Sequence, residues 1–516
     1  MGILISIVYA SLFVWLAWKL VSLISGKQQG PYPPGPKTLP LVGNMFDLPL
    51  SDSPKTYAEW GRKYNSNLLH ASALGNHLLI INSCEDADEL FERRSRKYSG
   101  RPALPVTKLM GWEFNVGLLP YGELWRFHRK ICQQNFSRKV APKYHAVELE
   151  KVHQMLRNLL NTPENFDDHN KMLSISIPMA AMYGYDVKSF DDPCIVAANQ
   201  SFILGNYLLL PGSTYINILP ALAYIPAWFP GASSRKVAAK VRHLTKEMKR
   251  IPMEFVKKGV EEGTVIPSLV GDFFEKKCNA GASIEEEEAT ENVANTVYGA
   301  ASDTTISSTG TFFYLMALHP DIQMKAQAEI DSVIGQKRLP DFNDRDSLPY
   351  VEAIYRELMR IRPPVPLGVP HALTEDDYYK GYFIPKGTTV IGNIWAMTHN
   401  EKEYPESFKF KPERFLDENG NLNGDDKILA YGFGRRICAG QHIASSTMWI
   451  IITSVLACFN ISKSKDKAGK EIEIKDDYDD FGLVTGNMPT LSHKAPFECS
   501  FVPRSSMAVQ LIANTK

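Results

Sequence analysis

The stretch of sequence that decides the fold is Tyr431-Gly-Phe-Gly-Arg-Arg-Ile-Cys-Ala-Gly440. Its glycines permit a tight turn whose backbone N–H groups can face the sulfur of Cys438. The apolar run from Ile443 to Cys458 predicts a helix, so the sulfur should lie near the positive end of that helix. Two arginines precede the cysteine, and such an electropositive turn is expected to stabilise a thiolate. Most lone cysteines are inert core residues, but this turn predicts a functional sulfur.

The overall composition excludes several classes of protein. With 516 residues, 44% hydrophobic and 22% charged, the chain has the balance of a globular protein and is not disordered as a whole. Its 57 basic residues equal its 57 acidic residues, whereas a chain that mainly binds nucleic acid normally carries a basic excess. Seven scattered cysteines, with no C-x-x-C pair, disfavour a disulfide scaffold and a structural zinc site. The composition therefore indicates a large, reduced protein with room for a buried cofactor.

Residues 1–25 are expected to form a transmembrane anchor. Gly2 to Trp18 carries no charge, and the apolar run continues beyond Lys19, which gives the ~20 residues that a spanning helix needs. A cleaved signal peptide is the alternative, but no basic segment precedes the run and no A-x-A site follows it. The nearby lysines lie on the C-terminal side, so the positive-inside rule predicts a single-pass protein whose remainder is cytosolic. A proline-rich hinge over residues 26–45 then leads into one domain over residues 46–516.

The rest of the chain predicts a mainly α fold with a small β part (α+β). Helical periodicity dominates from about Ser53 to Ile361, and short strand-like runs occur at Leu78–Ile81 and Thr388–Ile391. An aromatic, proline-broken loop at Tyr224–Gly231 is expected either in the core or as a second membrane contact, since tryptophan favours the membrane interface.

A long helix with an irregular centre is predicted before Pro320. Ser283 and Glu286 fit a capping box, and the helical pattern runs to about Leu318. Its middle reads Ala300-Ala-Ser-Asp-Thr-Thr305, where small residues let a ligand approach the backbone and where Asp and Thr are mediocre helix formers. Poor helix formers in the middle of a strongly predicted helix often mark a functional site. A solvated turn with a polar patch explains these six residues equally well.

These two motifs together resemble the cytochrome P450 family of haem-thiolate monooxygenases. The cysteine turn matches the family signature F-x-x-G-x-R-x-C-x-G at Gly434, Arg436, Cys438 and Gly440. Tyr431 replaces the usual phenylalanine and adds a hydroxyl that must find a partner. The stretch at 300–305 is similar to the family's oxygen-activation motif, with Ala301 in place of glycine. Because of the extra methyl group of Ala301, the sequence does not determine the shape of the oxygen groove. The acid and the alcohol of the motif are both present.

Further matches to the family are spread along the chain. Glu357 and Arg360 match its E-x-x-R, and Arg414 matches the arginine that joins this pair, so the resemblance gives the three a structural role. Trp125 and Arg129 match W-x-x-x-R, and their i, i+4 spacing places both on one face of a helix. The resemblance implies cofactor contacts by Trp125, Arg129, His371 and Arg436, with Cys438 as the iron ligand.

The resemblance also implies a cofactor, a redox partner and a catalytic pair. The cofactor is haem b bound through the Cys438 thiolate, and electrons come from NADPH through NADPH–cytochrome P450 reductase. Asp303 and Thr304 then deliver protons while O2 is activated. Candidate pocket residues, by their position in the family's recognition segments, are Phe114, Val297, Ala301, Val365, Leu367 and Leu483. They are mostly apolar, which suits a lipophilic substrate, although each fits an ordinary core position equally well.

The expected activity is insertion of one oxygen atom of O2 into a C–H bond of a lipophilic small molecule. We expect it at the endoplasmic reticulum membrane, with the catalytic domain on the cytosolic face. Gly43–Met45, Met110–Phe114 and Trp228–Gly231 resemble basidiomycete monooxygenases of secondary metabolism, a group that includes terpenoid oxidases and the tryptamine 4-hydroxylase. A terpenoid substrate is favoured, with an indole amine or a polyketide as alternatives. The rival activities are a reductase-independent haem-thiolate isomerase or dehydratase, and non-enzymatic haem binding.

Overall fold

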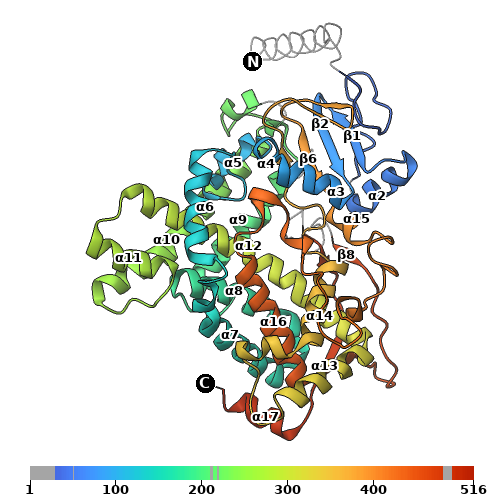
Figure 1. Ribbon diagram of the computed structural model, residues 1–516. Coiled ribbons are helices and arrows are strands. Elements are labelled where there is room, and N and C mark those ends of the chain that lie inside the picture. Colours follow the sequence, from blue (N-terminus) through green and yellow to red (C-terminus); the bar gives the residue numbers. More distant parts are fainter. Residues whose placement is uncertain (1–29, 50, 210–212, 218–219, 480–490, 516) are drawn as a thin grey trace.

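The chain folds mainly into helices with small sheets, as the sequence predicts (Figure 1). The computed structural model describes residues 30–49, 51–209, 213–217, 220–479 and 491–515. The predicted anchor over residues 1–25 and the predicted pocket residue Leu483 lie outside these ranges. Cysteines 84, 132, 194, 438, 458 and 499 are all free thiols, in agreement with the reduced protein that the composition indicates.

The longer helices build most of the core. They are α2 (Ser53–Lys63), α6 (Glu123–Phe136), α7 (His145–Asn161), α8 (Phe166–Tyr183), α9 (Pro193–Leu209), α10 (Ser233–Glu262), α11 (Leu269–Ala280), α12 (Ile284–Leu318), α13 (Pro320–Val333), α14 (Pro349–Ile361), α16 (Gln441–Cys458) and α17 (Ser506–Ala513). Shorter helices are α3 (Cys84–Ala87), α4 (Ser95–Tyr98), α5 (Pro105–Met110) and α15 (Ile394–Thr398). The strands are β1 (Leu68–Ala73), β2 (Asn76–Ile81), β3 (His371–Ala372), β4 (Asp377–Tyr379), β5 (Tyr382–Ile384), β6 (Thr389–Gly392), β7 (Phe459–Lys463), β8 (Tyr478–Asp479), β9 (His493–Lys494) and β10 (Cys499–Pro503).

The largest sheet joins the two strand segments that the sequence predicts. Its order is β1-β2-β6-β3, and β2 and β6 run parallel with Leu79 opposite Val390. The runs predicted at 78–81 and 388–391 fall in β2 and β6, the second shifted by one residue. Leu79 and Val390 belong to the same buried cluster as Phe91 and Phe433. Because Phe433 is part of the cysteine turn, the sheet packs directly behind that turn.

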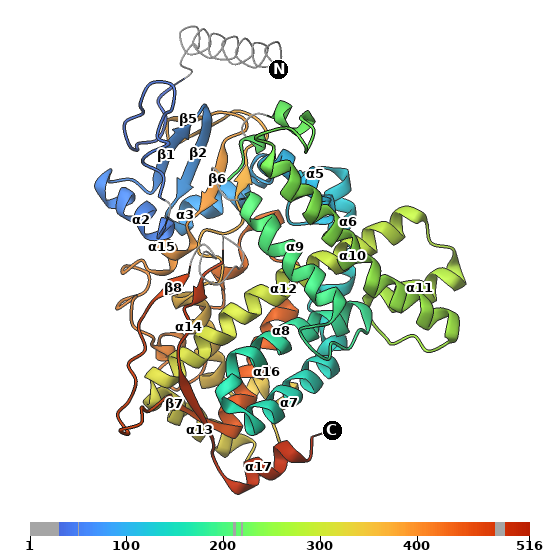
Figure 2. The same cartoon turned by 180° about the vertical axis from the view of Figure 1, so that it is seen from behind.

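Helix α12 crosses the centre of the molecule. The predicted capping box is confirmed, since Ser283 Oγ accepts the Glu286 N–H at 3.2 Å and the Ser283 N–H donates to Glu286 Oε2 at 3.0 Å. The helix then continues without a break through residues 300–305. In Figure 1 α16 lies in front of α12, and in Figure 2, seen from behind, α8 and α9 do. Helix α12 is therefore enclosed by other helices and packs against both α8 and α16.

Helix α16 follows the cysteine turn, as predicted. It begins at Gln441, three residues after Cys438, and packs against α7, α12, α13 and α14. Among the described helices it alone is long and apolar enough to cross a bilayer by these two measures, and most of it is buried inside the protein. An apolar helix enclosed by others in this way is a core helix.

The aromatic loop before α10 does not lie in the core. Tyr224 is 89% exposed and Trp228 is 77% exposed. Burial in the core, one of the two alternatives that the sequence left open, is therefore wrong, because the prolines carry these side chains out into solvent.

A buried acid links α7 to the helix that follows the cysteine turn. Glu148 is 0% exposed, and its Oε1 accepts the hydroxyls of Ser446 and Thr447 at 2.9 and 2.7 Å. Its Oε2 has no hydrogen-bond partner within the described residues. Burial raises the pKa of this carboxyl to about 7, against about 4.3 for an unburied glutamate. The folded protein therefore holds a proton here that the unfolded chain releases.

The pH dependence of stability should follow from this acid. Because the folded-state pKa is raised, its stabilising contribution is complete below about pH 4 and is lost as the pH rises to about 7. The loss is on the order of 3 kcal/mol. Glu148→Gln keeps an oxygen acceptor without a charge, so it should flatten the unfolding midpoint between pH 5 and pH 8 and stabilise the protein at pH 8. The exposed neighbour Glu150→Gln is the control. Equal destabilisation by Glu148→Gln at both pH values would contradict the prediction.

Candidate active site

The turn around Cys438 is fixed by its backbone. The Cys438 N–H donates to the carbonyl of Tyr431 at 2.8 Å. Gly434 has φ +56°, and a Cβ there would lie 2.1 Å from the carbonyl oxygen of Phe91, so only glycine fits this position. The Gly434 N–H also donates to Glu92 Oε1 at 2.6 Å. The turn is thus seated on the segment Asp88–Arg93, which itself packs on the sheet.

The extra hydroxyl of Tyr431 finds the partner that it needs. It lies 2.7 Å from the hydroxyl of Tyr355 in α14. A buried hydroxyl without a partner would cost about 1–3 kcal/mol. The departure from the usual phenylalanine is therefore compensated within the structure, and it ties the turn to α14.

Cys438 is exposed, although protein lies close around its thiol. Protein surrounds the thiol closely enough that burial raises its pKa, yet its surface is accessible to solvent. The Gly440 N–H and the charge of Arg129 act in the opposite direction on the pKa but do not outweigh burial. The expectation that the turn by itself stabilises a thiolate is therefore wrong. A thiolate here needs a cation as its neighbour, and a ligated metal ion supplies one.

The irregular centre of α12 faces an interior space. Ala300 is exposed although Tyr298 and Ser302, on either side of it, are buried. Thr304 Oγ1 donates to the Ala300 carbonyl at 2.8 Å, a local bond typical of threonine within helices. Asp303, Thr304 and Ala301 are all partly exposed. Val297, one turn before the motif, and Ala439, which follows Cys438, both pack against one buried cluster.

Arg436 lies in this region with one donor unused. Its Nε donates to the Ser99 carbonyl at 2.9 Å and its Nη2 to the Leu119 carbonyl at 2.8 Å. Its guanidinium stacks over the ring of Trp125 at 4.3 Å. The buried Nη1 has no hydrogen-bond partner in the described part of the chain. Arg435, the other arginine of the turn, points away and binds Ser95 and Tyr121.

Three further cationic or ionisable groups surround Arg436. Burial and the charge of Arg129 lower the pKa of Arg436 to about 10. Burial and Arg436 lower that of Arg101 to about 9. The pKa of His371 lies well below its usual value because of burial, Arg101 and Arg436. No carboxylate of the described ranges forms an ion pair with Arg101, Arg129 or Arg436, all of which are partly exposed, so the positive charge of this cluster is not neutralised.

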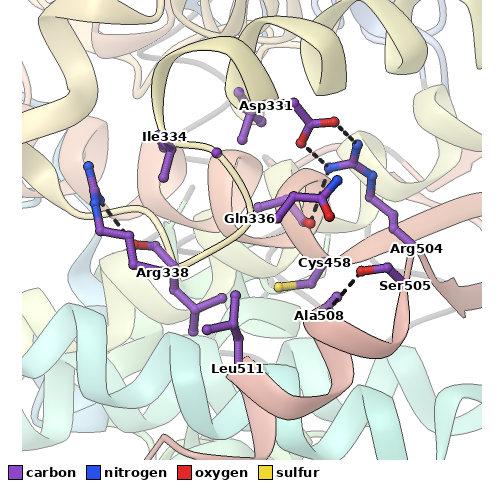
Figure 3. A pocket seen from close by; sticks show the side chains of 13 residues that line it. Asp331, Ile334, Gln336, Arg338, Cys458, Arg504, Ser505, Ala508 and Leu511 are labelled. Atoms are coloured by element: carbon purple, nitrogen blue, oxygen red, sulfur yellow. Dashed lines mark hydrogen bonds and ion pairs between the residues drawn. The ribbon is translucent and has the colours of Figure 1, made fainter.

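A second cavity contains an arginine that, unlike those of this cluster, is paired with a carboxylate. Figure 3 shows a cavity of about 70 Å3 between α13, α16 and α17. Its Arg504 forms two hydrogen bonds to Asp331, at 2.6 and 3.1 Å, so the charge is neutralised where it stands. Unpaired buried arginines are costly unless an anion joins them. The cluster at Arg436 therefore has the composition of a site for a dianionic ligand beside the sulfur.

Haem b fits these requirements. It would bring an iron for Cys438 and two carboxylates that arginines bind well. Arg436, Arg129, Trp125 and His371, which the resemblance names, are all near the unneutralised cluster, whereas Arg101 was missed. The carbonyls of Val369 and Pro370 accept Arg101 Nη1, both at 2.8 Å, which places this arginine beside His371. That pairing joins segments about 270 residues apart, and no local pattern in the sequence signals it.

The structural triad forms as the sequence indicates. Arg360 donates to both oxygens of Glu357 at 2.6 and 2.8 Å, and Arg414 Nε lies 3.1 Å from the same carboxylate. Arg360 also binds the carbonyls of Thr398 and Ser407. Both oxygens of Glu357 are paired and Arg360 also donates to backbone carbonyls, which lowers the cost of burying these charges.

The candidate pocket residues occupy different environments. Phe114 is buried, and its carbonyl accepts Thr296 Oγ1 of α12 at 3.2 Å. Val297 and Ala301 lie on α12, and Val365 and Leu367 follow α14; all four are partly buried. Phe202 of α9 was not predicted, although a Cβ on Gly299 would lie 2.7 Å from its ring. Phe202 therefore borders the same part of α12.

Comparison with known proteins gives one family. The family model for Cytochrome P450 matches residues 33–489. A cytochrome P450 monooxygenase of Coprinopsis cinerea is 40% identical, covering 96% of this chain and 93% of that protein. One of Rhodocybe pseudopiperita is 36% identical, covering 97% and 95%. The tryptamine 4-monooxygenase of Psilocybe cyanescens is 34% identical, covering 93% and 94%.

The unneutralised arginine cluster yields a binding prediction. Arg436→Ala should weaken haem b binding about 10- to 100-fold, because a hydrogen bond to a charged group contributes about 1.5–3 kcal/mol. Titration of the haem-depleted protein, followed by absorbance, measures this. Arg435→Ala is the control, since Arg435 is exposed and points away from the cluster.

A second ligand separates charge from structure. Haem dimethyl ester lacks both carboxylates, so it should bind more weakly to the wild type and be insensitive to Arg436→Ala. If the substitution weakened binding of the ester as much as that of haem b, Arg436 would have only a structural role.

Proposed function

The chain belongs to the cytochrome P450 family, and we propose that it hydroxylates a lipophilic secondary metabolite, a terpenoid in the first instance, at the endoplasmic reticulum membrane. It is a monooxygenase and an oxidoreductase that incorporates oxygen from O2. The family uses haem b with a cysteine thiolate ligand, and the iron supplies the chemistry by which one oxygen atom enters a C–H bond. In the proposal Cys438 is that ligand. The single observation that carries it is the exposed Cys438 beside Arg436, whose buried Nη1 has no hydrogen-bond partner in the described part of the chain.

Asp303 and Thr304 supply protons in this proposal. The Thr304 hydroxyl is held on the Ala300 carbonyl at 2.8 Å, and a turn about χ1 would redirect it into the interior space. Asp303, its neighbour in the chain, is also partly exposed to that space. An acid and an alcohol next to each other on one helix can pass a proton to a reacting oxygen, whereas an isomerase needs no such delivery.

Electrons reach this enzyme from a reductase that docks on a basic surface. We define the proximal basic surface as Arg126, Lys130, Arg138, Lys139 and Arg435, which are all exposed. None of these five pairs with a carboxylate within the described residues, so their charge is available to a partner. The surface flanks the cysteine turn, since α6 also carries Arg129, whose charge acts on Cys438. An acidic face on the reductase would complement it and speed association.

The membrane side of the protein is an apolar end. We define the apolar apex as Leu39, Leu41, Met45, Phe46, Tyr215, Tyr224 and Trp228, which are all at least 47% exposed. Figures 1 and 2 show the segment after residue 30 and the loop before α10 at the same end of the molecule. Such aromatic and aliphatic side chains favour the membrane interface. The anchor proposed for residues 1–25 leads to this end through the hinge, where the Pro34 carbonyl accepts the His70 N–H at 2.9 Å.

We propose an apolar substrate because the candidate pocket residues have apolar side chains. Phe114, Val297, Val365 and Leu367 offer hydrocarbon surface, and Phe202 adds an aromatic wall over Gly299. Sites of this kind bind lipophilic ligands and use few polar groups for orientation. We favour a terpenoid, and an indole amine or a polyketide is tested beside it.

The experiment is turnover in microsomes that contain the chain and a fungal NADPH–cytochrome P450 reductase. Terpenoids, indole amines and polyketides are supplied as a panel, and products are measured by mass spectrometry. We expect a product heavier by one oxygen, labelled by 18O2 and absent without NADPH. A product that forms equally without NADPH would replace the proposal with an isomerase or dehydratase.

The same assay tests the alcohol of the catalytic pair. Thr304→Ala should keep NADPH consumption but lower product at least about 10-fold and release the electrons as H2O2, since general acid catalysis typically contributes 10²–10⁴-fold. Thr304→Ser keeps the hydroxyl and should restore most of the coupling. Unchanged coupling in Thr304→Ala would remove Thr304 from the proton path.

A further inference from the structure

The carboxylate of Asp303 faces a histidine from a distant part of the chain. His493 Nε2 lies 3.2 Å from Asp303 Oδ1, with the two side chains 5% and 20% exposed. His493 belongs to β9, 190 residues after Asp303, and no motif in the sequence includes it. Among the described groups this nitrogen has no hydrogen-bond partner, so the carboxylate at ion-pair distance is its charged neighbour.

The backbone of β9 is tied down on two sides. Ser307, one turn after Asp303 on α12, donates its hydroxyl to the Ser492 carbonyl at 2.6 Å. The Ser492 N–H donates to the Pro364 carbonyl at 2.9 Å. Residues four apart share one face of a helix, so the contact through Ser307 aligns β9 with the face that carries Asp303. The imidazole is therefore held opposite the carboxylate by bonds that do not involve either side chain.

The charged surroundings of His493 come from two elements. Asp303 faces it from α12, and Asp479 is its register partner on β8. The next residue along β9, Lys494, turns its ammonium over the rings of Tyr314 and Tyr478 and pairs with Asp477. Imidazole is the side chain that gains and loses a proton near neutral pH. A histidine between a partly exposed acid and the β8 strand is suited to hand protons to that acid.

We propose that His493 is a positioning residue that orients Asp303 and restores its proton in each turnover. The inference rests on the proposed function. Reduction of O2 by two electrons from NADPH takes up two protons, one oxygen atom leaving as water and the other entering the substrate. In our scheme Asp303 gives up a proton as a carboxylic acid, the carboxylate takes a proton from the His493 imidazolium, and the neutral imidazole takes one from water. NADPH supplies two electrons and the substrate C–H bond, which is oxidised to C–OH, supplies the other two, so His493 itself is neither oxidised nor reduced.

The test uses the full-length chain in vesicles with reductase, NADPH and O2, without added substrate. His493→Gln should slow O2-dependent NADPH oxidation at least about 5-fold, increase the effect of D2O on that rate, and change the pH profile of that rate. Asp303→Asn should do the same. The double variant should be no slower than Asp303→Asn alone, because both residues then act in one path.

A control separates proton delivery from structure. Ser492→Ala changes the adjacent residue of β9, whose contacts run through its backbone, and should leave the rate, the D2O effect and the pH profile as in the wild type. Haem content and the thermal midpoint are measured for every variant.

Two outcomes would overturn the inference. One is a His493→Gln variant with an unchanged D2O effect and pH profile, and the other is a double variant in which the two losses multiply. A wild type that binds haem but consumes no NADPH with O2 would instead refute the proposed function.

Discussion

The structure around Cys438 depends on arginine charges that no carboxylate of the described residues neutralises. The charge of Arg129 acts on Cys438 and on Arg436, and that of Arg436 acts on Arg101; within the described residues none of the three has a carboxylate partner. The fold can bury a neutralised arginine, as it does with Arg504 and Asp331. Leaving three unpaired is costly and makes sense when a ligand brings the anions. The same ligand must bring a cation for the sulfur, since burial alone keeps the thiol protonated.

The remaining structure holds this arrangement in place. Glu357, Arg360 and Arg414 form a fully bonded triad that fixes the segment leading to the cysteine turn. Gly434 seats the turn on the sheet side, and Tyr431 ties it to α14 through Tyr355. On the opposite side, α12 is long enough to present small residues at its centre while its flanking turns stay buried. The cysteine turn and the motif of α12 are thus each held in place by contacts to neighbouring elements.

The sequence predicted those elements that depend on interactions between residues close together in the chain. The cap at Ser283, the strands in β2 and β6, and the helix after Cys438 follow from periodicity and capping chemistry. Long-range pairing explains what was missed. Arg101 reaches the cluster because the segment after Tyr98 pairs with that of His371. His493 meets Asp303 because Ser307 binds the backbone before it. The raised pKa of Cys438 was mispredicted because the turn's charges are visible in sequence, whereas the depth of burial is not.

The most direct test of the account is the absorption spectrum of the purified protein after reduction and exposure to carbon monoxide. After reduction and addition of carbon monoxide, a haem ligated by a thiolate is distinguished by its Soret band from a haem with a neutral or nitrogen ligand. We predict the thiolate-type band for the wild type and its loss in Cys438→Ala. A wild type without haem, or a thiolate-type band that survives in Cys438→Ala, would contradict the assignment of Cys438 as the iron ligand.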